Sequence, residues 1–224
     1  MGLFDFLKKK RIDEPVNQST KIEEDVKQTT TAMIADSSTE FAEEETGVII
    51  NGVKWATRNV DNQGRFVAKP EATGMLYQWN RKKAWAAIGE TVNGWSNSDP
   101  SGTIWEKVND PSPVGWRIPT IEEIGKLFDK EKVINEWTTV NSVNGRKFTD
   151  KATGKSIFLP AVGCRSGRDG SLYGIGSYGD YWSSTQSRDF VPRGAYSLHF
   201  YDSNSHWESC YDKACGYSIR SVAE

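Results

Sequence analysis

Both histidines of the chain and two of its three cysteines lie within seventeen positions near the C-terminus. These residues are His199, His206, Cys210 and Cys215. Imidazole and thiolate are the usual zinc ligands, but structural zinc sites take two ligands from one tight turn, spaced as C-x2-4-C or H-x3-5-H. The spacing here is H-x6-H-x3-C-x4-C, which contains neither pair. We therefore predict no metal site and no cofactor.

The two cysteines suggest nucleophilic chemistry as a second interpretation. A reactive cysteine needs a pKa that is lowered by a nearby cation or by a helix N-terminus. The sequence does not place either feature beside Cys210 or Cys215, so a thiol enzyme is kept as an alternative. The odd, low cysteine count does not resemble a disulfide framework, and free thiols are expected.

A recognition surface is the third interpretation of the same segment. The alternation in AYSLHFYDS predicts a strand with two different faces. One face would carry Tyr196, Leu198 and Phe200, and the other would carry Ser197, His199 and Tyr201. Tyr, Ser, Asn and His are favoured in binding loops, because aromatic rings supply rigid contact area and small polar side chains adapt their hydrogen bonds. An ordinary solvated face is the structural alternative.

The elements that must position these residues include one well-marked helix. Thr120 and Glu123 form a T-x-x-E capping box, which predicts a helix over about residues 120–130. A second helix is predicted over 74–85, GMLYQWNRKKAW, although its apolar residues do not separate it cleanly from a strand. The turn pair N-G at the centre of VIINGVKWATRNV predicts a β-hairpin.

The last third of the chain is predicted to consist of strands joined by turns, among them KSIFLPAVG and YSIRSVA. The region 86–116 shows little periodicity, so we expect Trp95, Trp105 and Trp116 to anchor it by burying their indoles. Stacking of these tryptophans on a sugar is the alternative. Short mixed strands, one or two helices and long irregular loops together predict the α+β class.

Composition divides the chain into three parts. All nine tryptophans lie between Trp55 and Trp207, and the globular domain is predicted over 47–224. Residues 11–46 carry ten acidic side chains against three basic ones and a single aromatic residue, which predicts a disordered acidic linker. Residues 1–10, MGLFDFLKKK, predict an amphipathic segment that contacts a membrane surface or a partner protein.

Charge and hydropathy argue against nucleic-acid binding, against a membrane-spanning segment and against secretory export. The net charge is -2 and the basic residues are scattered, so nucleic acid is not expected as a partner. No apolar run is long enough to cross a bilayer, and apolar residues precede the lysines at the N-terminus, the reverse of a secretory signal. We therefore expect synthesis in the cytoplasm without export by that route.

Seven segments occur in a characteristic order over about residues 48–224. They are GVKWATRNV, GMLYQWNRKKAW, DPSPVGWRIPTIEEIGKL, SIFLPAVGCRS, GSLYGIGSYGDYWSST, AYSLHFYDSN and CGYSIRSVAE. This order resembles the Fibrobacter succinogenes major paralogous domain family. The resemblance implies a C-type lectin-like fold, in which the N- and C-terminal strands pair and the irregular loops cluster on one side.

The resemblance also bears on redox state, on calcium and on catalysis. Many members of that family carry cysteines where this chain has Arg58 and Ser112, and their joint loss suits a protein that meets no oxidising compartment. The E-P-N, Q-P-D and W-N-D triplets of calcium lectins are absent from the domain, so no calcium is expected. GWRIPTIEEI is similar to an element of formylglycine-generating enzymes, whose two cysteines are spaced like Cys210 and Cys215 but at positions that do not correspond.

Domains that this chain resembles also serve as variable proteins of diversity-generating retroelements. In those systems a reverse transcriptase rewrites adenine positions near the 3′ end of the gene. The resemblance implies a variable recognition face from about Tyr178 onward, where the chain is rich in the residue types that such rewriting produces. The resemblance is also compatible with association of the protein with a phage particle or with a membrane surface.

We therefore predict a non-catalytic module that binds a protein or glycan ligand through its C-terminal surface. The predicted contact residues are Tyr178, Asp180, Tyr181, Ser184, Gln186, Arg188, His199, Tyr201, Ser203, Ser205, His206, Trp207, Cys210, Tyr211 and Lys213. The predicted scaffold beneath them is Trp182, Leu198, Phe200, Tyr217 and Ile219. An oxidase of the formylglycine-generating type and a purely structural module are the alternatives.

Overall fold

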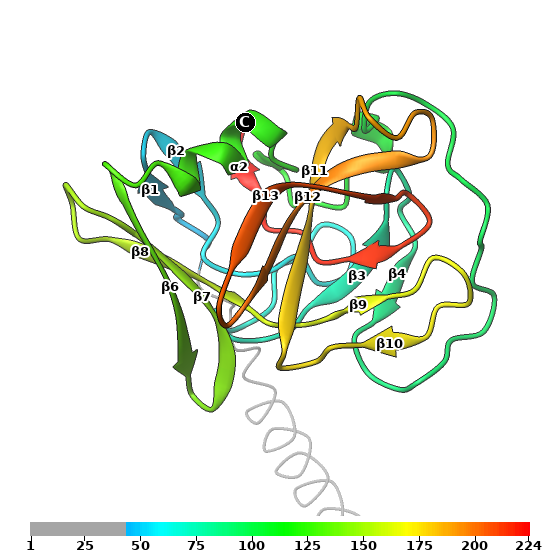
Figure 1. The fold of residues 1–224 in the computed structure, drawn as a ribbon, viewed down its shortest axis with the longest axis horizontal. Helices are drawn as coiled ribbons and strands as arrows, with labels where there is room; N and C mark the ends of the chain where they lie inside the picture. Colours follow the sequence, from blue (N-terminus) through cyan, green and yellow to red (C-terminus); the bar gives the residue numbers. More distant parts are fainter. Residues whose placement is uncertain (1–43) are drawn as a thin grey trace, which may run out of the picture. The chain divides into compact units, whose positions relative to one another are not determined.

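The computed structural model describes residues 44–224, with the side chain of Cys210 outside the described part. The predicted segment 1–10 and nearly all of the predicted linker 11–46 lie outside these residues. Strands account for 41% of the structure and helix for 6%. The predicted α+β class, a C-type lectin-like fold with one or two helices, is therefore wrong, and the domain is β-rich (Figure 1).

Residues 44–224 form four antiparallel sheets. The first contains, in spatial order, β1 (Val48–Ile50), β2 (Val53–Trp55), β15 (Val222–Ala223) and β5 (Trp116–Arg117). The second contains β10 (Leu172–Tyr173), β9 (Cys164–Arg165), β14 (Gly216–Tyr217), β3 (Met75–Gln78) and β4 (Ala84–Ala86). The third contains β11 (Tyr178–Gln186), β12 (Gly194–Tyr201) and β13 (Ser205–Asp212). The fourth contains β6 (Val133–Val140), β7 (Val143–Asp150) and β8 (Ser156–Pro160).

The helical segments are short. They are η1 (Lys107–Asn109), α2 (Ile121–Gly125) and η2 (Lys126–Phe128). The predicted capping box is confirmed, because the Thr120 hydroxyl accepts from the Glu123 N–H at 3.3 Å and the Glu123 carboxylate accepts from the Thr120 N–H at 2.8 Å. Within residues 44–224, no helix has the length and apolar character needed to span a membrane.

The segment 74–85, predicted as a helix, is a pair of strands. β3 pairs with β4 on one side and with β14 on the other. Asn80 has a φ of 54°, in the left-handed region, which ends the first strand in a turn. Leu76 and Trp79 are both buried because neighbouring sheets and loops cover this strand on both faces. Their helix-like spacing therefore reflects burial on both sides and not an amphipathic stripe.

The predicted N-G hairpin is confirmed. β1 pairs with β2 in the register Val48 with Trp55, and the two turn residues Asn51 and Gly52 have φ values of 45° and 77°. Positive φ at both central residues is the geometry of the tight turns that fit the strand twist. β15 pairs with β2 as well, so the N- and C-terminal strands pair as the resemblance implies.

Contacts of the domain include residues before the predicted boundary at 47. The Glu45 carboxylate accepts from Arg58 Nε at 2.9 Å and from the Thr57 hydroxyl at 2.8 Å. Arg58 is one of the two positions where many members of the resembling family carry cysteine. At the other, the Ser112 and Ser221 hydroxyls lie 2.7 Å apart, so both positions have polar partners.

Of the three predicted loop anchors, Trp105 is buried, whereas Trp95 and Trp116 are half-buried. Trp95 donates its indole N–H to the Gly167 carbonyl at 3.1 Å, and Trp105 is buried and donates to a carbonyl of its own loop. Trp116 packs edge-on against Phe66 with ring centroids 5.6 Å apart. Each indole therefore ties irregular chain to the domain through both apolar contact and a defined geometry.

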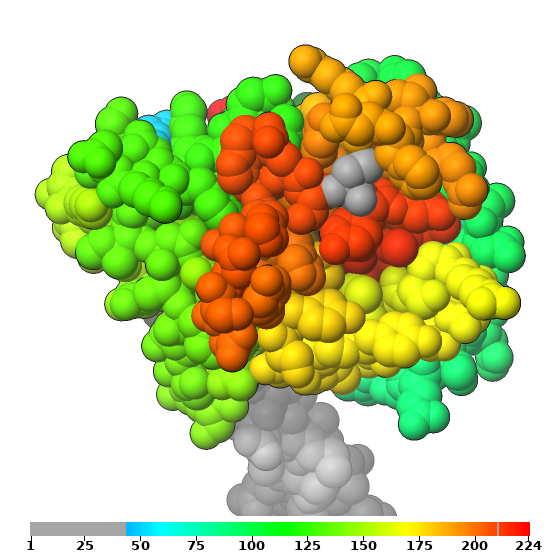
Figure 2. Space-filling view, viewed as in Figure 1, coloured from blue at the N-terminus to red at the C-terminus, as the bar shows by residue number. Residues whose placement is uncertain are grey.

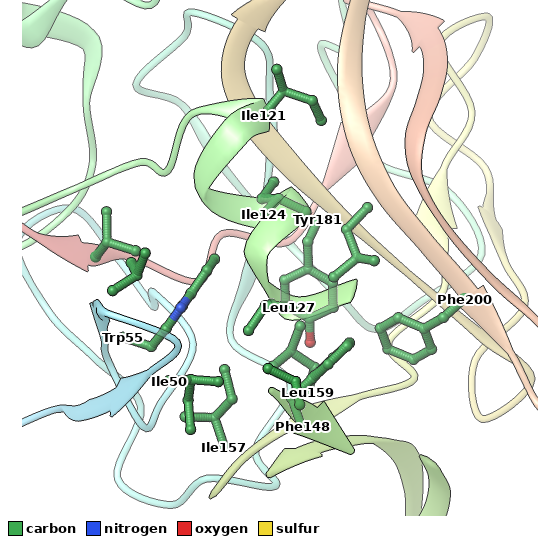
Figure 3. Packing of buried hydrophobic residues seen from close by; sticks show 14 of the residues in the cluster. Ile50, Trp55, Ile121, Ile124, Leu127, Phe148, Ile157, Leu159, Tyr181 and Phe200 are labelled. Atoms are coloured by element: carbon green, nitrogen blue, oxygen red, sulfur yellow. The ribbon is translucent and has the colours of Figure 1, made fainter. Parts of the chain in front are cut away.

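The sheet β11–β12–β13 lies between two buried apolar clusters. Tyr181 and Phe200 point into one cluster, where their rings stack with centroids 5.9 Å apart and which also contains Ile124 of α2 (Figure 3). Trp182 and Tyr217 belong to the other cluster and stack with ring centroids 4.2 Å apart. The predicted scaffold is confirmed as buried: Trp182, Leu198, Phe200, Tyr217 and Ile219.

Candidate functional site

Strand pairing places predicted contact residues side by side across the third sheet. Asp180 of β11 lies opposite His199 of β12, and His199 lies opposite His206 of β13. Tyr178 lies opposite Tyr201 on the same face. The alternation predicted for β12 is therefore confirmed for Leu198 and Phe200, which are in the first apolar cluster, and for His199 and Tyr201, which are half-buried on the opposite face. Ser197, predicted on that outward face, is fully buried instead.

Asp180 and His199 form the polar centre of this face. Asp180 Oδ1 lies 2.9 Å from His199 Nδ1, and the Asp180 residue is only 2% exposed. Burial raises the pKa of Asp180 above its usual value, while the hydrogen bond from His199 acts in the opposite direction. The carboxylate fixes the orientation of the imidazole, because a buried acceptor of this kind is costly to leave unpaired.

Three tyrosine rings surround the imidazole. Their centroids lie 5.6 Å (Tyr178), 5.8 Å (Tyr201) and 6.2 Å (Tyr211) from the centroid of His199. Tyr211 also packs edge-on against the buried Tyr217 at 5.7 Å and is 38% exposed. We call Tyr178, His199, Tyr201, His206 and Tyr211 the tyrosine–histidine face.

Two thiols lie beneath this face. The Cys164 sulfur lies 3.5 Å from the Tyr178 hydroxyl, and both Cys164 and Cys215 pack against the second apolar cluster. Burial raises the pKa of Cys164 to about 12 and that of Cys215 to about 11. Both thiols are therefore protonated at neutral pH and are weak nucleophiles. Among the described side chains, no three His, Cys, Asp or Glu groups are arranged to hold a metal ion.

The remaining predicted contact residues are distributed over the sheet edge and the neighbouring loops. Ser203 and Ser205 lie at the β12–β13 turn, and Trp207 packs against the first apolar cluster. Arg188 is exposed in the loop after β11, whereas the Ser184 hydroxyl donates to the Pro119 carbonyl at 3.2 Å. These residues do not converge on the tyrosine–histidine face.

Besides Asp180, two further predicted contact residues are buried, and this corrects the assignment of all three. Tyr181 is buried in the first cluster and donates its hydroxyl to the Pro160 carbonyl at 2.9 Å. Lys213 is fully buried, with its ammonium 4.4 Å from the Trp79 ring centroid and within 3.1 Å of the Gln186 side-chain oxygen. Lys213 is buried because its cation is satisfied by a carbonyl, an amide and an aromatic face.

The described surface also has hollows, one of which includes His206 of the tyrosine–histidine face. One, of about 630 Å³, is lined by apolar side chains around Trp105 and Trp116 and by polar and charged ones, among them Lys107, Asp110, Arg117 and Glu224. Two others, of about 350 Å³ and about 480 Å³, adjoin each other beside the β12–β13 turn. They contain Arg146 and Lys130, which the sequence pattern did not single out, because an arginine in a strand and a lysine after a helix are ordinary surface features.

Comparison with known proteins gives one match. Residues 129–222 match the model of a family described as a domain of unknown function, DUF8237. No curated protein and no solved structure matches the chain. The matched range runs from the residue after η2 into β15, so it includes the whole tyrosine–histidine face.

Proposed function

We propose that the chain is a non-catalytic binding module whose recognition surface is the tyrosine–histidine face. The observation that carries this proposal is the ring of three tyrosines around His199, held in place by the buried Asp180 carboxylate. Tyrosine rings supply large contact area with little conformational entropy to lose on binding. Their support is rigid, because Phe200 and Trp182 fill the two clusters on either side of the same strands.

The chemistry around His199 supports binding over catalysis. A histidine–aspartate pair activates a nucleophile only when a suitable hydroxyl or thiol lies beside it. Of the two cysteines on which the thiol alternative rests, Cys210 has its side chain outside the described part, and burial raises the pKa of Cys215 to about 11; burial also raises the pKa of Cys164 to about 12. An oxidase of the formylglycine-generating type requires a reactive thiolate, so these raised pKa values count against that alternative.

The same surface supports the hypothesis that the protein is varied by a diversity-generating retroelement. Exposed or half-exposed positions that adenine rewriting would alter, such as His199, Tyr201 and Tyr211, alternate with the buried Leu198 and Phe200. A variable face needs this separation, because changes at exposed positions rarely affect stability. The test is the gene: a near-copy of its 3′ end that differs only at adenines, beside a reverse transcriptase, is expected. A copy that differs at other bases would contradict the hypothesis.

The binding proposal is tested by a double substitution on the face, Tyr201→Ala with Tyr211→Ala. The purified protein is applied to arrays of glycans and of cell-surface proteins, and the ligands it retains are titrated. We expect the double variant to bind about ten-fold more weakly or worse, which corresponds to about 1.4 kcal/mol. Its melting temperature should stay within about 2 °C of that of the parent, because both rings are partly exposed.

The matched control removes two exposed apolar side chains outside the face, Ile49→Ala with Ile88→Ala. This control should bind as the parent does. Equal binding by the face variant and the control would refute the proposal. A large fall in the melting temperature of the face variant would show that these tyrosines belong to the core.

A further inference from the structure

We propose a second binding site, for a carboxylated sugar residue, in the hollow between the β12–β13 turn and the segment from η2 to β6. The hollow has a volume of about 350 Å³, within the range of about 300–1,000 Å³ that is typical of small-ligand pockets. In Figure 2 the orange surface of residues 202–209 lies beside the green surface of residues 120–150. The side chains that line this hollow do not include any of the tyrosine–histidine face, although the adjoining hollow described below includes His206.

Arg146 supplies the positive charge at the base of the hollow. The residue is only 8% exposed, and its partners are neutral. Nη1 donates to the Tyr201 carbonyl at 2.7 Å and to the Asn204 carbonyl at 2.9 Å, and Nε donates to the Asn135 side-chain oxygen. Within the described residues, Nη2 has no hydrogen-bond partner and Arg146 has no carboxylate partner.

A buried guanidinium without a counter-charge favours an incoming anion. Buried cations are normally paired, because their desolvation is offset only by an opposite charge or by several hydrogen bonds. The planar fork of an arginine fits a carboxylate well, and Nη2 is the part of that fork that remains open. The lowered pKa of Arg146, which results from burial, is consistent with this uncompensated charge.

Lys130 adds a second cation at the rim of the hollow. It is exposed, and within the described residues its ammonium forms no ion pair. The residues that line this hollow include Lys130 and Arg146 but no aspartate or glutamate. The electrostatic potential of the hollow therefore selects an anion over a neutral or cationic ligand.

The rest of the lining is suited to a sugar ring. Its neutral polar side chains, Asn135, Ser203, Asn204 and Ser205, offer donors and acceptors for hydroxyl groups. Phe128 provides an apolar surface for the C–H face of the ring. A simple phosphate would use the two cations but not this combination of apolar and hydroxyl-binding surface.

The adjoining hollow indicates that the ligand is longer than one residue. It has a volume of about 480 Å³ and shares Phe128, Lys130 and Ser205 with the first. Trp207 also lines it, so a neighbouring sugar would meet an indole. Glu208 lines the adjoining hollow as well, so we place the carboxylate of the ligand at Arg146 and a second linked sugar beside Trp207.

The test is a titration of the full chain with digalacturonate, in which binding is monitored through the amide chemical shifts in NMR spectra. We expect saturable shifts in residues 128–135 and 203–207, with a Kd on the order of 1 mM or tighter. The dimethyl ester of digalacturonate has the same shape without the charges and should bind about ten-fold more weakly or not at all. Equal binding of the ester would overturn the proposal, and so would equal binding of inorganic phosphate.

Two lysine variants separate a local site from general attraction. Lys130→Gln should weaken digalacturonate binding by about five-fold or more, because it removes one of the two cations of the lining. Lys132→Gln removes an exposed charge two residues away that does not line the hollow, and it should have little effect. Equal losses in the two variants would overturn the proposal. Arg146→Lys retains the positive charge but not the planar guanidinium fork, so it should also weaken binding. Its free energy of unfolding is measured as a control and should equal that of the parent.

Discussion

Asp180 shows how one buried side chain organises a surface. It is on the same face of the sheet as His199, as the strand alternation predicts, yet it is buried because aromatic rings cover that face. Its hydrogen bond orients His199, and the three tyrosines pack around the imidazole. The sequence predicted that Asp180 would contact a ligand, whereas the structure gives it a positioning role.

The raised pKa of Asp180 predicts how stability depends on pH. A carboxyl whose pKa in the folded protein exceeds the usual value of 3.8 binds its proton more tightly when folded. Its contribution to stability is fully present below that usual pKa and is lost as the pH rises through the folded pKa. The free energy of unfolding of the parent should therefore fall, relative to that of Asp180→Asn, as the pH rises above about 4.

The measurement is urea unfolding of both proteins at several pH values between about 3.5 and 7. Asp169→Asn is the control, because backbone hydrogen bonds lower the pKa of Asp169 and the pH dependence should have the opposite sign. If the difference in free energy of unfolding between the parent and Asp180→Asn does not change with pH, the raised pKa of Asp180 is contradicted.

At the scale of elements, local signals were predictable and long-range pairings were not. The capping box of α2 and the N-G hairpin depend on residues within a few positions of each other, and both are confirmed. The segment 74–85 forms strands because β3 pairs with β14, whose residues lie about 140 positions further along the chain. No local pattern reports a partner at that separation.

The capping box predicts the effect of Thr120→Ala. The substitution removes the hydroxyl that accepts from the Glu123 N–H, and the loss of such a cap costs about 1 kcal/mol. Urea unfolding should report this decrease in the free energy of unfolding. Thr91→Ala, at an exposed loop position, is the control and should change stability by less than about 0.5 kcal/mol. Equal effects of the two substitutions would show that the box does not stabilise the helix.

At the scale of the whole molecule, the core is shared between the two halves of the chain. The Trp182 indole donates to the Tyr77 carbonyl at 2.7 Å, and the buried Arg220 donates to the Asn59 side chain at 2.7 Å. β15 lies between β2 and β5. The range 129–222 that matches a family model is therefore only part of one folding unit.

This shared core predicts the behaviour of two fragments. Residues 44–224 alone should unfold in one cooperative transition with the midpoint of the full chain, because the described core lies within them. Residues 129–224 alone should lack a cooperative transition, since Trp55, Tyr77 and Trp79 would be missing from the two clusters. Near-ultraviolet circular dichroism during urea titration distinguishes these outcomes. Cooperative unfolding of the shorter fragment would contradict a shared core.

The sequence by itself determined the features that depend on nearest neighbours along the chain. It identified the helix start at Thr120, the hairpin turn, the inward and outward faces of β12, and the tryptophans that anchor the loops. These follow from capping, turn chemistry and a period of two, which act over a few residues.

Only the tertiary structure decided which side chains meet. The fold is β-rich and not α+β as predicted. Tyr181 and Lys213, predicted at the surface, are buried, and Tyr211 packs beside His199. The tertiary structure also brought Arg146 to the β12–β13 turn, where its charge has no partner among the described carboxylates. The physical reason is that strand register and burial result from pairing between distant segments, and one sequence pattern is compatible with many such pairings.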